Sequence, residues 1–256
     1  MVSTQHGSFL VKDGLVFDPI PKSFRKRDVL VRDGKICQVG EGIPAAGGEA
    51  IFQAAGKLVL PGLIDFHVHC FRCGMALGID ADDLAPRAGT TTFVDAGSSG
   101  SLNFPAFREY VITPATARIL AFLNISAIGL QTSGASGIDF AENDDDRLLD
   151  VPSAVEVIQK NPEFMALGLP LEEALVKSTY APALKLRWER ECGTLSEGSD
   201  ADIGIFELRD GTFDFSDTYG NSLRASRRLV PLTTFRKGVM LPVSSRETMR
   251  YDFVAK

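Results

Sequence analysis

The chain has 256 residues, of which 45% are hydrophobic and 23% charged, a composition typical of a folded globular protein and not of a disordered one. Its formal net charge of −6 offers no basic surface to nucleic acid or to an acidic membrane, so we expect its partner to be a small molecule or another protein. No apolar run reaches the ~20 residues needed to cross a bilayer, the first residues do not resemble a signal peptide, and four cysteines are too few for a disulfide framework. These features predict a cytoplasmic protein and leave its oligomeric state open.

Both ends of the chain are predicted to be rich in β-strands. Residues 8–54 alternate apolar and polar positions between turns, and Asp33-Gly34 is typical of a tight hairpin turn. The C-terminal part has the same texture. Its predicted strands are 201–208, 228–236 and 239–243, and its predicted turns are Asp210-Gly211 and Lys237-Gly238.

The middle of the chain alternates between the two kinds of element. Its predicted strands are the apolar stretches 57–65, 91–95 and 118–126, and its predicted helices are 82–88, 105–111, 151–160 and a last one that begins at 171. Strands that alternate with helices are typical of βα units around a parallel sheet. The fold class predicted from the residues is therefore α/β.

Two histidines, His67 and His69, directly follow the predicted strand 57–65. Side chains two residues apart on a strand point the same way, and ligands bind at the carboxyl ends of parallel strands. Two imidazoles on one side of a strand end can begin a site for a divalent metal such as zinc.

Cys70 and Cys73 extend this pattern to His-x-His-Cys-x-x-Cys. The four side chains are chemically suited to zinc, but their crowding within seven residues is awkward for one ion, because structural zinc sites draw their ligands from separate segments. The favoured interpretation is that both cysteines are ordinary thiols in a loop.

Residues 58–69 (LVLPGLIDFHVH) and residues 89–98 (GTTTFVDAGS) are two apolar strand motifs that end in polar residues. They resemble the first and second barrel strands of the amidohydrolase superfamily of metal-dependent hydrolases, in its dihydroorotase-like and deacetylase branch. Gly193-Thr194-Leu195, followed by Ala201-Asp202, is similar to the strand that returns to their small β domain. Segments 124–126 and 219–238 also have counterparts in that branch.

The resemblance implies an incomplete TIM-type (β/α) barrel of about three βα units plus the last helix, with a small composite β sandwich built from both chain ends. The composite domain would comprise 1–56 and 192–256, and the partial barrel 57–191. The implied reaction is hydrolysis of a C–N amide or an acetyl ester bond by a hydroxide activated on divalent metal, zinc by expectation, with two ions in the complete family. The residues it implies are His67 and His69 as metal ligands, and Asp95, Gly97, Asn124 and Ser126 as substrate-binding residues.

The sequence departs from the family in its metal ligands. The only histidines are His6, His67 and His69, whereas the family has two further histidines on later strands, a bridging carboxylated lysine and an aspartate that acts as general base. The family pattern breaks near Phe164–Met165, as if the units between had been deleted. Lys160 and Lys177 remain, but neither is placed at a predicted strand end.

These absences leave the catalytic residue unknown and predict a chain whose hydrolytic activity is impaired. Whether it is an active enzyme stays open. The alternative is a non-catalytic truncated product, which would be a gene-model or splicing artefact or a remnant that serves only in association.

Overall fold

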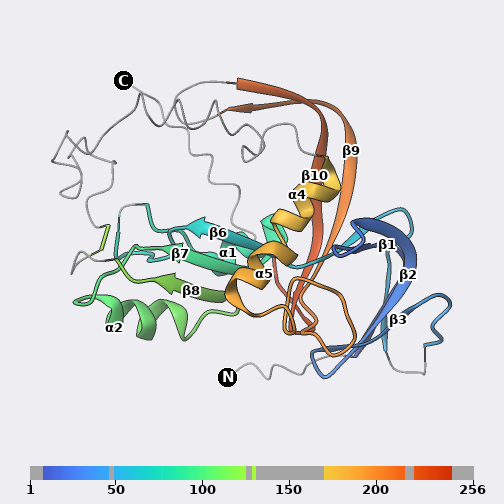
Figure 1. Cartoon of the computed structure of the whole chain (residues 1–256), viewed down its shortest axis with the longest axis horizontal. Helices are drawn as coiled ribbons and strands as arrows, with labels where there is room; N and C mark the ends of the chain where they lie inside the picture. The colour runs from blue at the N-terminus through green and yellow to red at the C-terminus, as the bar shows by residue number, and fades with distance from the viewer. Residues whose placement is uncertain are drawn as a thin grey trace.

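The computed structural model describes residues 8–45, 49–75, 77–124, 129–130, 170–216 and 222–243. Within these residues one sheet of eight strands combines both ends of the chain, in the order β11-β10-β9-β5-β1-β2-β3, with β4 paired to β1 (Figure 1). Its strands are β1 (Phe9–Asp18), β2 (Ser23–Arg32), β3 (Lys35–Gly40), β4 (Ala50–Gln53), β5 (Leu58–Pro61), β9 (Ile203–Ser216), β10 (Ser222–Arg236) and β11 (Val239–Met240).

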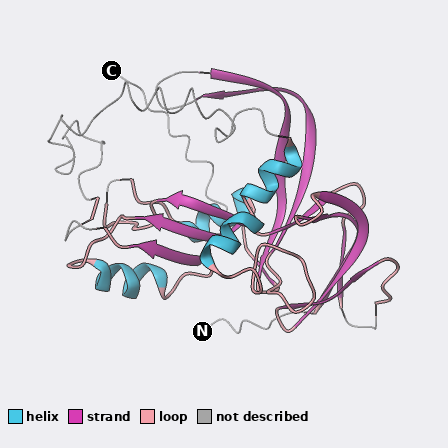
Figure 2. Ribbon diagram, in the orientation of Figure 1, coloured by secondary structure: helices cyan, strands magenta, loops and turns pink. Residues whose placement is uncertain are grey.

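A second sheet contains three parallel strands, β6 (Leu63–Val68), β7 (Thr90–Ala96) and β8 (Arg118–Phe122), in that order. The three arrows point the same way in Figure 2, with helices packed beside them. The helices are α1 (Ala81–Ala88), α2 (Phe104–Phe107) with the π-helical turn η1 (Arg108–Ile112), α4 (Leu171–Lys177) and α5 (Tyr180–Leu186). The predicted α/β class is confirmed, while the predicted helix 151–160 lies outside the described residues.

The turns at the two ends of the eight-stranded sheet, between β2 and β3 and between β10 and β11, lie close together, since a Cβ atom at Gly238 would be 3.0 Å from Cα of Gly34. At the predicted turns, Asp33-Gly34 and Lys237-Gly238 all have positive φ, as a two-residue type I′ hairpin requires. Ala201 joins the two turns, because its N–H donates to the Gly34 carbonyl at 2.9 Å and its carbonyl accepts from the Gly238 N–H at 2.9 Å. The eight described strands from the two chain ends form one continuous sheet, and the composite β sandwich stays a prediction.

The core of this sheet contains side chains from both chain ends. Phe9 of β1 stacks on Phe235 of β10 with ring centroids 4.4 Å apart, and both side chains are buried. Val59 of β5 and Ile203 of β9 belong to the same buried cluster. The N- and C-terminal segments therefore fold as one unit, whereas its boundaries at 56 and 192 stay predictions.

The single strand predicted over 57–65 is wrong, because the chain leaves one sheet and enters the other at Gly62. β5 pairs with β1 and β9, whereas β6 pairs with β7. A Cβ atom at Gly62 would lie 2.2 Å from Oγ1 of Thr91, so the crossing needs a glycine. The break therefore depends on a contact with a residue distant in sequence.

The turn predicted at Asp210-Gly211 is also wrong, because β9 continues through it. Asp210 pairs with Arg227 and Phe213 pairs with Ala225, so β9 has an extra residue opposite β10 there. Such a bulge bends a strand without ending it. The pairing of β9 with β10 on both sides of Asp210-Gly211 therefore determines the conformation there, and the local preference for a turn does not.

A cluster of buried charges joins the two sheets. Arg118 of β8 lies 2.8 Å from Asp200, and Arg236 of β10 lies 2.9 Å from Asp202. The Arg118 guanidinium also lies over the ring of Trp188, 4.7 Å from its centroid. We call these four charged residues the buried charge cluster.

Because of the buried charge cluster, the free energy of unfolding is expected to fall at acid pH. Burial raises the pKa of the Asp200 carboxyl, but the hydrogen bond from Lys35 and the positive charges around it lower that pKa more, so it lies below 3.8. A depressed folded-state pKa stabilises the protein above the unfolded value, and this stability is lost as the pH falls through the folded-state pKa. We expect the difference in unfolding free energy between the wild type and Asp200→Asn to shrink below about pH 4. Urea titrations at several pH values measure it, and a difference that stays constant with pH would contradict this origin.

Candidate metal centre

His67 and His69 lie where the parallel strand β6 ends, at the edge that the carboxyl ends of β7 and β8 share (Figure 2). His67 is exposed and His69 is half-buried. Their ring centroids are 5.8 Å apart, with an angle of 84° between the ring planes. Zinc–nitrogen distances of about 2.0–2.1 Å place two imidazole centroids on a shared ion ~5–6 Å apart. The separation of the two rings therefore fits one divalent ion.

The ring of His69 is held by a chain of hydrogen bonds. Its Nδ1 lies 3.0 Å from Oγ of Ser98, and that hydroxyl donates to Oδ2 of Asp95 at 2.7 Å. Because the Ser98 hydroxyl hydrogen is directed to Asp95, its oxygen accepts the hydrogen of Nδ1. This arrangement leaves Nε2 of His69 as the nitrogen with a free lone pair, which is the form that binds a metal.

Asp95 is fully buried beneath this edge of the sheet. Besides the Ser98 hydroxyl, its carboxylate accepts the Ser98 N–H at 2.8 Å and the Cys70 N–H at 2.7 Å. Burial lowers the pKa of His69, the negative charge of Asp95 opposes this, and His67 lowers the pKa further, so the net shift is downward. The neutral imidazole is therefore favoured at neutral pH.

The other predicted site residues lie beside this chain of hydrogen bonds. Gly97 has φ of 91°, and its carbonyl accepts from Nδ2 of Asn124 at 3.2 Å. The Asn124 N–H donates to the Ser99 carbonyl at 2.9 Å, which fastens the loop after β7 to the end of β8. Ser126 lies outside the described residues. The fold thus brings Asp95, Gly97 and Asn124 to the edge that carries His69.

Ser98 was not predicted as a site residue, although it is in the stretch 89–98 that resembles a barrel strand. Its signal in the sequence is the Asp-x-x-Ser spacing after a buried strand, where an aspartate commonly accepts hydrogen bonds from the following turn. That spacing predicts the bond between Asp95 and Ser98. It does not predict the contact with His69, which arrives from another strand.

The cysteines beside the histidines differ in exposure. Cys70 is buried, and burial raises the pKa of its thiol to about 12, so the thiol stays protonated. Cys73 is exposed and has φ of 63°. Across the described ranges no group of three or more His, Cys, Asp or Glu side chains is placed to hold a metal ion. Ordinary thiols remain the favoured interpretation of both cysteines.

Of the two lysines weighed as possible ligands, the structure describes only Lys177. Lys177 is exposed at the last position of α4. Lys160 and the predicted junction at Phe164–Met165 lie outside the described residues.

The chain was compared with known proteins, and no family model matches it. A deacetylase of Agrobacterium fabrum is 43% identical over 104 residues, which cover 40% of this chain and 26% of that protein. A dihydroorotase of Citrifermentans bemidjiense is 32% identical over 139 residues, which cover 53% of this chain and 32% of that protein. The matches thus span about a quarter to a third of these relatives.

The fold has counterparts among solved structures. A dihydroorotase superposes with a TM-score of 0.71 at 20% identity, covering 92% of this chain and 99% of that one. An adenine deaminase gives a TM-score of 0.68 at 18% identity, with 91% and 99% covered. In the residues that the structure describes, no helix is long and apolar enough to cross a membrane. The relatives in sequence and the neighbours in fold agree with the resemblance of the strand motifs, and the chain is an amidohydrolase-like protein.

Proposed function

We propose that this chain carries the first-strand part of an amidohydrolase metal site, in which His67 and His69 hold one divalent ion, with zinc as the expected metal. The observation that supports it most is the 5.8 Å separation of the two imidazole rings at the carboxyl end of β6. When bound, such an ion supplies a hydroxide at neutral pH and polarises a carbonyl oxygen. The bond cleaved would be a C–N amide or an acetyl ester.

The chain's own residues prepare this site. Asp95 and Ser98 hold Nδ1 of His69, so that Nε2 is available for the metal, as outer partners of metal-binding histidines commonly do. Gly97 and Asn124, in the loops after β7 and β8, are proposed to contact the substrate, and so is Ser126, which lies outside the described residues. Asp95 is proposed to act mainly through Ser98, because its carboxylate is buried and already accepts hydrogen bonds.

We further propose that turnover by this chain is impaired. Catalytic zinc sites typically have about three protein ligands and an open position. His67 and His69 are two, and the only other histidine of the sequence, His6, precedes the first strand. Zinc is therefore expected to bind more weakly than in a three-ligand site and to support little hydrolysis.

The test combines zinc calorimetry with assays on N-acetyl amino acids, acetylated hydroxy acids and cyclic ureides. We expect one zinc ion per chain, loss of that binding in His67→Ala, and little or no hydrolysis. Absence of zinc binding would contradict the metal site. Rapid hydrolysis that His67→Ala abolishes would contradict the impairment and leave the metal site supported.

A second candidate, a truncated product without catalysis, is favoured by the break in the family pattern at Phe164–Met165. Sequencing of the transcript across these two codons tests it. An additional in-frame stretch of ~120 residues, the size of the missing barrel units, is the expected result if the break arises in splicing or gene prediction. A continuous reading through the two codons would contradict that origin.

Ser98→Ala is predicted to weaken zinc binding by about 10–100-fold, since loss of an outer partner frees the His69 ring to rotate and to change tautomer. Ser98→Thr keeps the hydroxyl and should restore most of the affinity. Ser99→Ala is the matched control, because Ser99 is equally buried and its hydroxyl has no hydrogen-bond partner in the described residues. Calorimetry measures all three, and equal effects of Ser98→Ala and Ser99→Ala would contradict the role of Ser98.

A further inference from the structure

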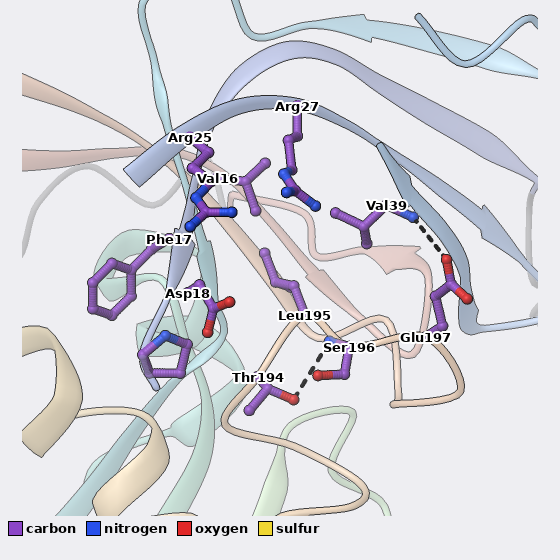
Figure 3. A pocket seen from close by; sticks show the side chains of 11 residues that line it. Val16, Phe17, Asp18, Arg25, Arg27, Val39, Thr194, Leu195, Ser196 and Glu197 are labelled. Atoms are coloured by element: carbon purple, nitrogen blue, oxygen red, sulfur yellow. Dashed lines mark hydrogen bonds between the residues drawn. The ribbon is translucent and has the colours of Figure 1, made fainter. Parts of the chain in front are cut away.

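A cavity of about 360 Å³ lies against the eight-stranded sheet, between strands β1–β3 and residues 194–197, which precede β9 (Figure 3). Its lining residues come from β1, β2 and β3, from Pro19 directly after β1, and from Thr194, Leu195, Ser196 and Glu197. No lining residue belongs to β6, β7 or β8, so the cavity is separate from the histidine pair. Its volume is at the lower end of the ~300–1,000 Å³ typical of small-molecule pockets.

Two arginines of β2 lie over this cavity. Arg25 and Arg27 are two residues apart on the strand and therefore share one face, and Figure 3 shows both side chains beside the cavity. In the described part of the chain neither guanidinium has an ion-pair partner. Lys26, between them, projects to the opposite face and lies 2.8 Å from Asp13. On one face of β2, Lys26 is paired with Asp13, and on the other face Arg25 and Arg27 are available to a ligand.

The acidic residues at the cavity are held by the backbone. Asp18 accepts the N–H of Ile20 at 3.1 Å, and Glu197 accepts the N–H of Val39 at 3.3 Å. Their two negative charges balance the two arginines across the cavity as a whole. A cavity without net charge offers no added attraction to a dianion such as a phosphate monoester, so a single carboxylate held directly by the guanidinium groups is the anion that fits.

The floor of the cavity is apolar. Val16 and Leu195 are each 5% exposed and belong to the core of the sheet, and Pro19, another lining residue, is also buried. Figure 3 shows the Val16, Leu195 and Arg27 side chains among those that line the cavity. A guanidinium group binds a carboxylate through two parallel hydrogen bonds. Two such groups next to an apolar surface therefore suit a small ligand that has a carboxylate at one end and a hydrophobic group at the other.

We propose that this cavity binds a small hydrophobic monocarboxylate, whose carboxylate is held by Arg25 and Arg27 and whose apolar body contacts Val16 and Leu195. The binding does not depend on a metal or on the histidine pair. It therefore adds a second ligand site to the one proposed above.

The experiment titrates the full chain with 4-phenylbutanoate and, separately, with the neutral 4-phenylbutanamide, following binding by calorimetry and by backbone amide signals of Val39 and Ser196. Saturable binding of the carboxylate is expected, and Arg27→Gln should weaken it by about tenfold or more, as for loss of a charged hydrogen bond. Lys26→Gln is the matched control, since it removes the same charge from the opposite face, and should leave the affinity unchanged.

Three results would overturn the proposal. They are no saturable binding of the carboxylate up to about 10 mM, equal affinity for the amide, and equal weakening by Lys26→Gln and Arg27→Gln. The melting temperature of each variant is measured first, because a lowered value would show that the fold was affected. Arg25→Gln then replaces Arg27→Gln as the test variant.

Discussion

Asp202→Ala is expected to lower the free energy of unfolding by about 3–5 kcal/mol, because it removes one partner from a buried ion pair. Asp202 is 2% exposed, and its Oδ1 accepts from Nη1 of Arg236 at 2.9 Å and from the Lys237 N–H at 2.9 Å. Without this carboxylate, Asp200 is the one buried counter-charge that Arg236 and Arg118 retain among the described residues. Urea unfolding monitored by fluorescence of Trp188 measures the loss.

A surface ion pair provides the control for this prediction. Arg224 and Asp214 form a pair at 2.8 Å whose side chains are 73% and 58% exposed. Exposed pairs contribute little to stability, so Arg224→Ala should leave the unfolding free energy almost unchanged. Asp202→Asn serves if the alanine variant does not fold, because it keeps the shape and an acceptor for the Lys237 N–H. Equal losses for Asp202→Asn and Arg224→Ala would contradict a stabilising role for the buried charge cluster.

Phe206→Ala is the second large effect, with an expected loss of about 3–5 kcal/mol for truncating a core aromatic side chain. Phe206 of β9 is 1% exposed and belongs to a cluster that includes Phe17, Leu60 and Leu175. Phe17 and Leu60 lie on strands of the eight-stranded sheet, whereas Leu175 lies on α4. The ring also lies against the end of α1, where a Cβ at Gly89 would be 2.1 Å from its Cζ atom.

Phe213 is the matched control, because it lies on the same strand and is half-exposed. Phe213→Ala should cost less than about half as much, since less apolar area is removed from the core. Urea unfolding of both variants provides the comparison. Similar losses would show that the strand, and not the contact between the sheet and α1, determines the stability.

Local signals in the sequence predicted the elements that depend on local conformation. The hairpins at Asp33-Gly34 and Lys237-Gly238 need two residues with positive φ, and all four residues of these two dipeptides have it. Asp210-Gly211 carries a similar signal but became a bulge, because the partner strand β10 extends past it. The division at Gly62 was missed for the same reason, as it depends on Thr91, a residue of another strand.

The candidate site was predictable to a similar extent. The placement of His67 and His69 follows from the end of an apolar strand and from the two-residue period of β-structure, and the structure has both at that end. The hydrogen bond between Ser98 and His69 was not predictable, because it forms only when the loop after β7 lies against β6. Its partners are 29 residues apart in the chain.

The metal site is tested most directly by NMR of protein labelled with ¹⁵N-histidine. The chain has three histidines, so His6 is an internal control for His67 and His69. Before metal is added, His69 should give the signals of a ring protonated on Nδ1. Zinc is predicted to shift the ring nitrogen signals of His67 and His69 together and to leave those of His6 in place. Zinc that shifts neither His67 nor His69, or shifts only His6, would contradict a metal site at the end of β6.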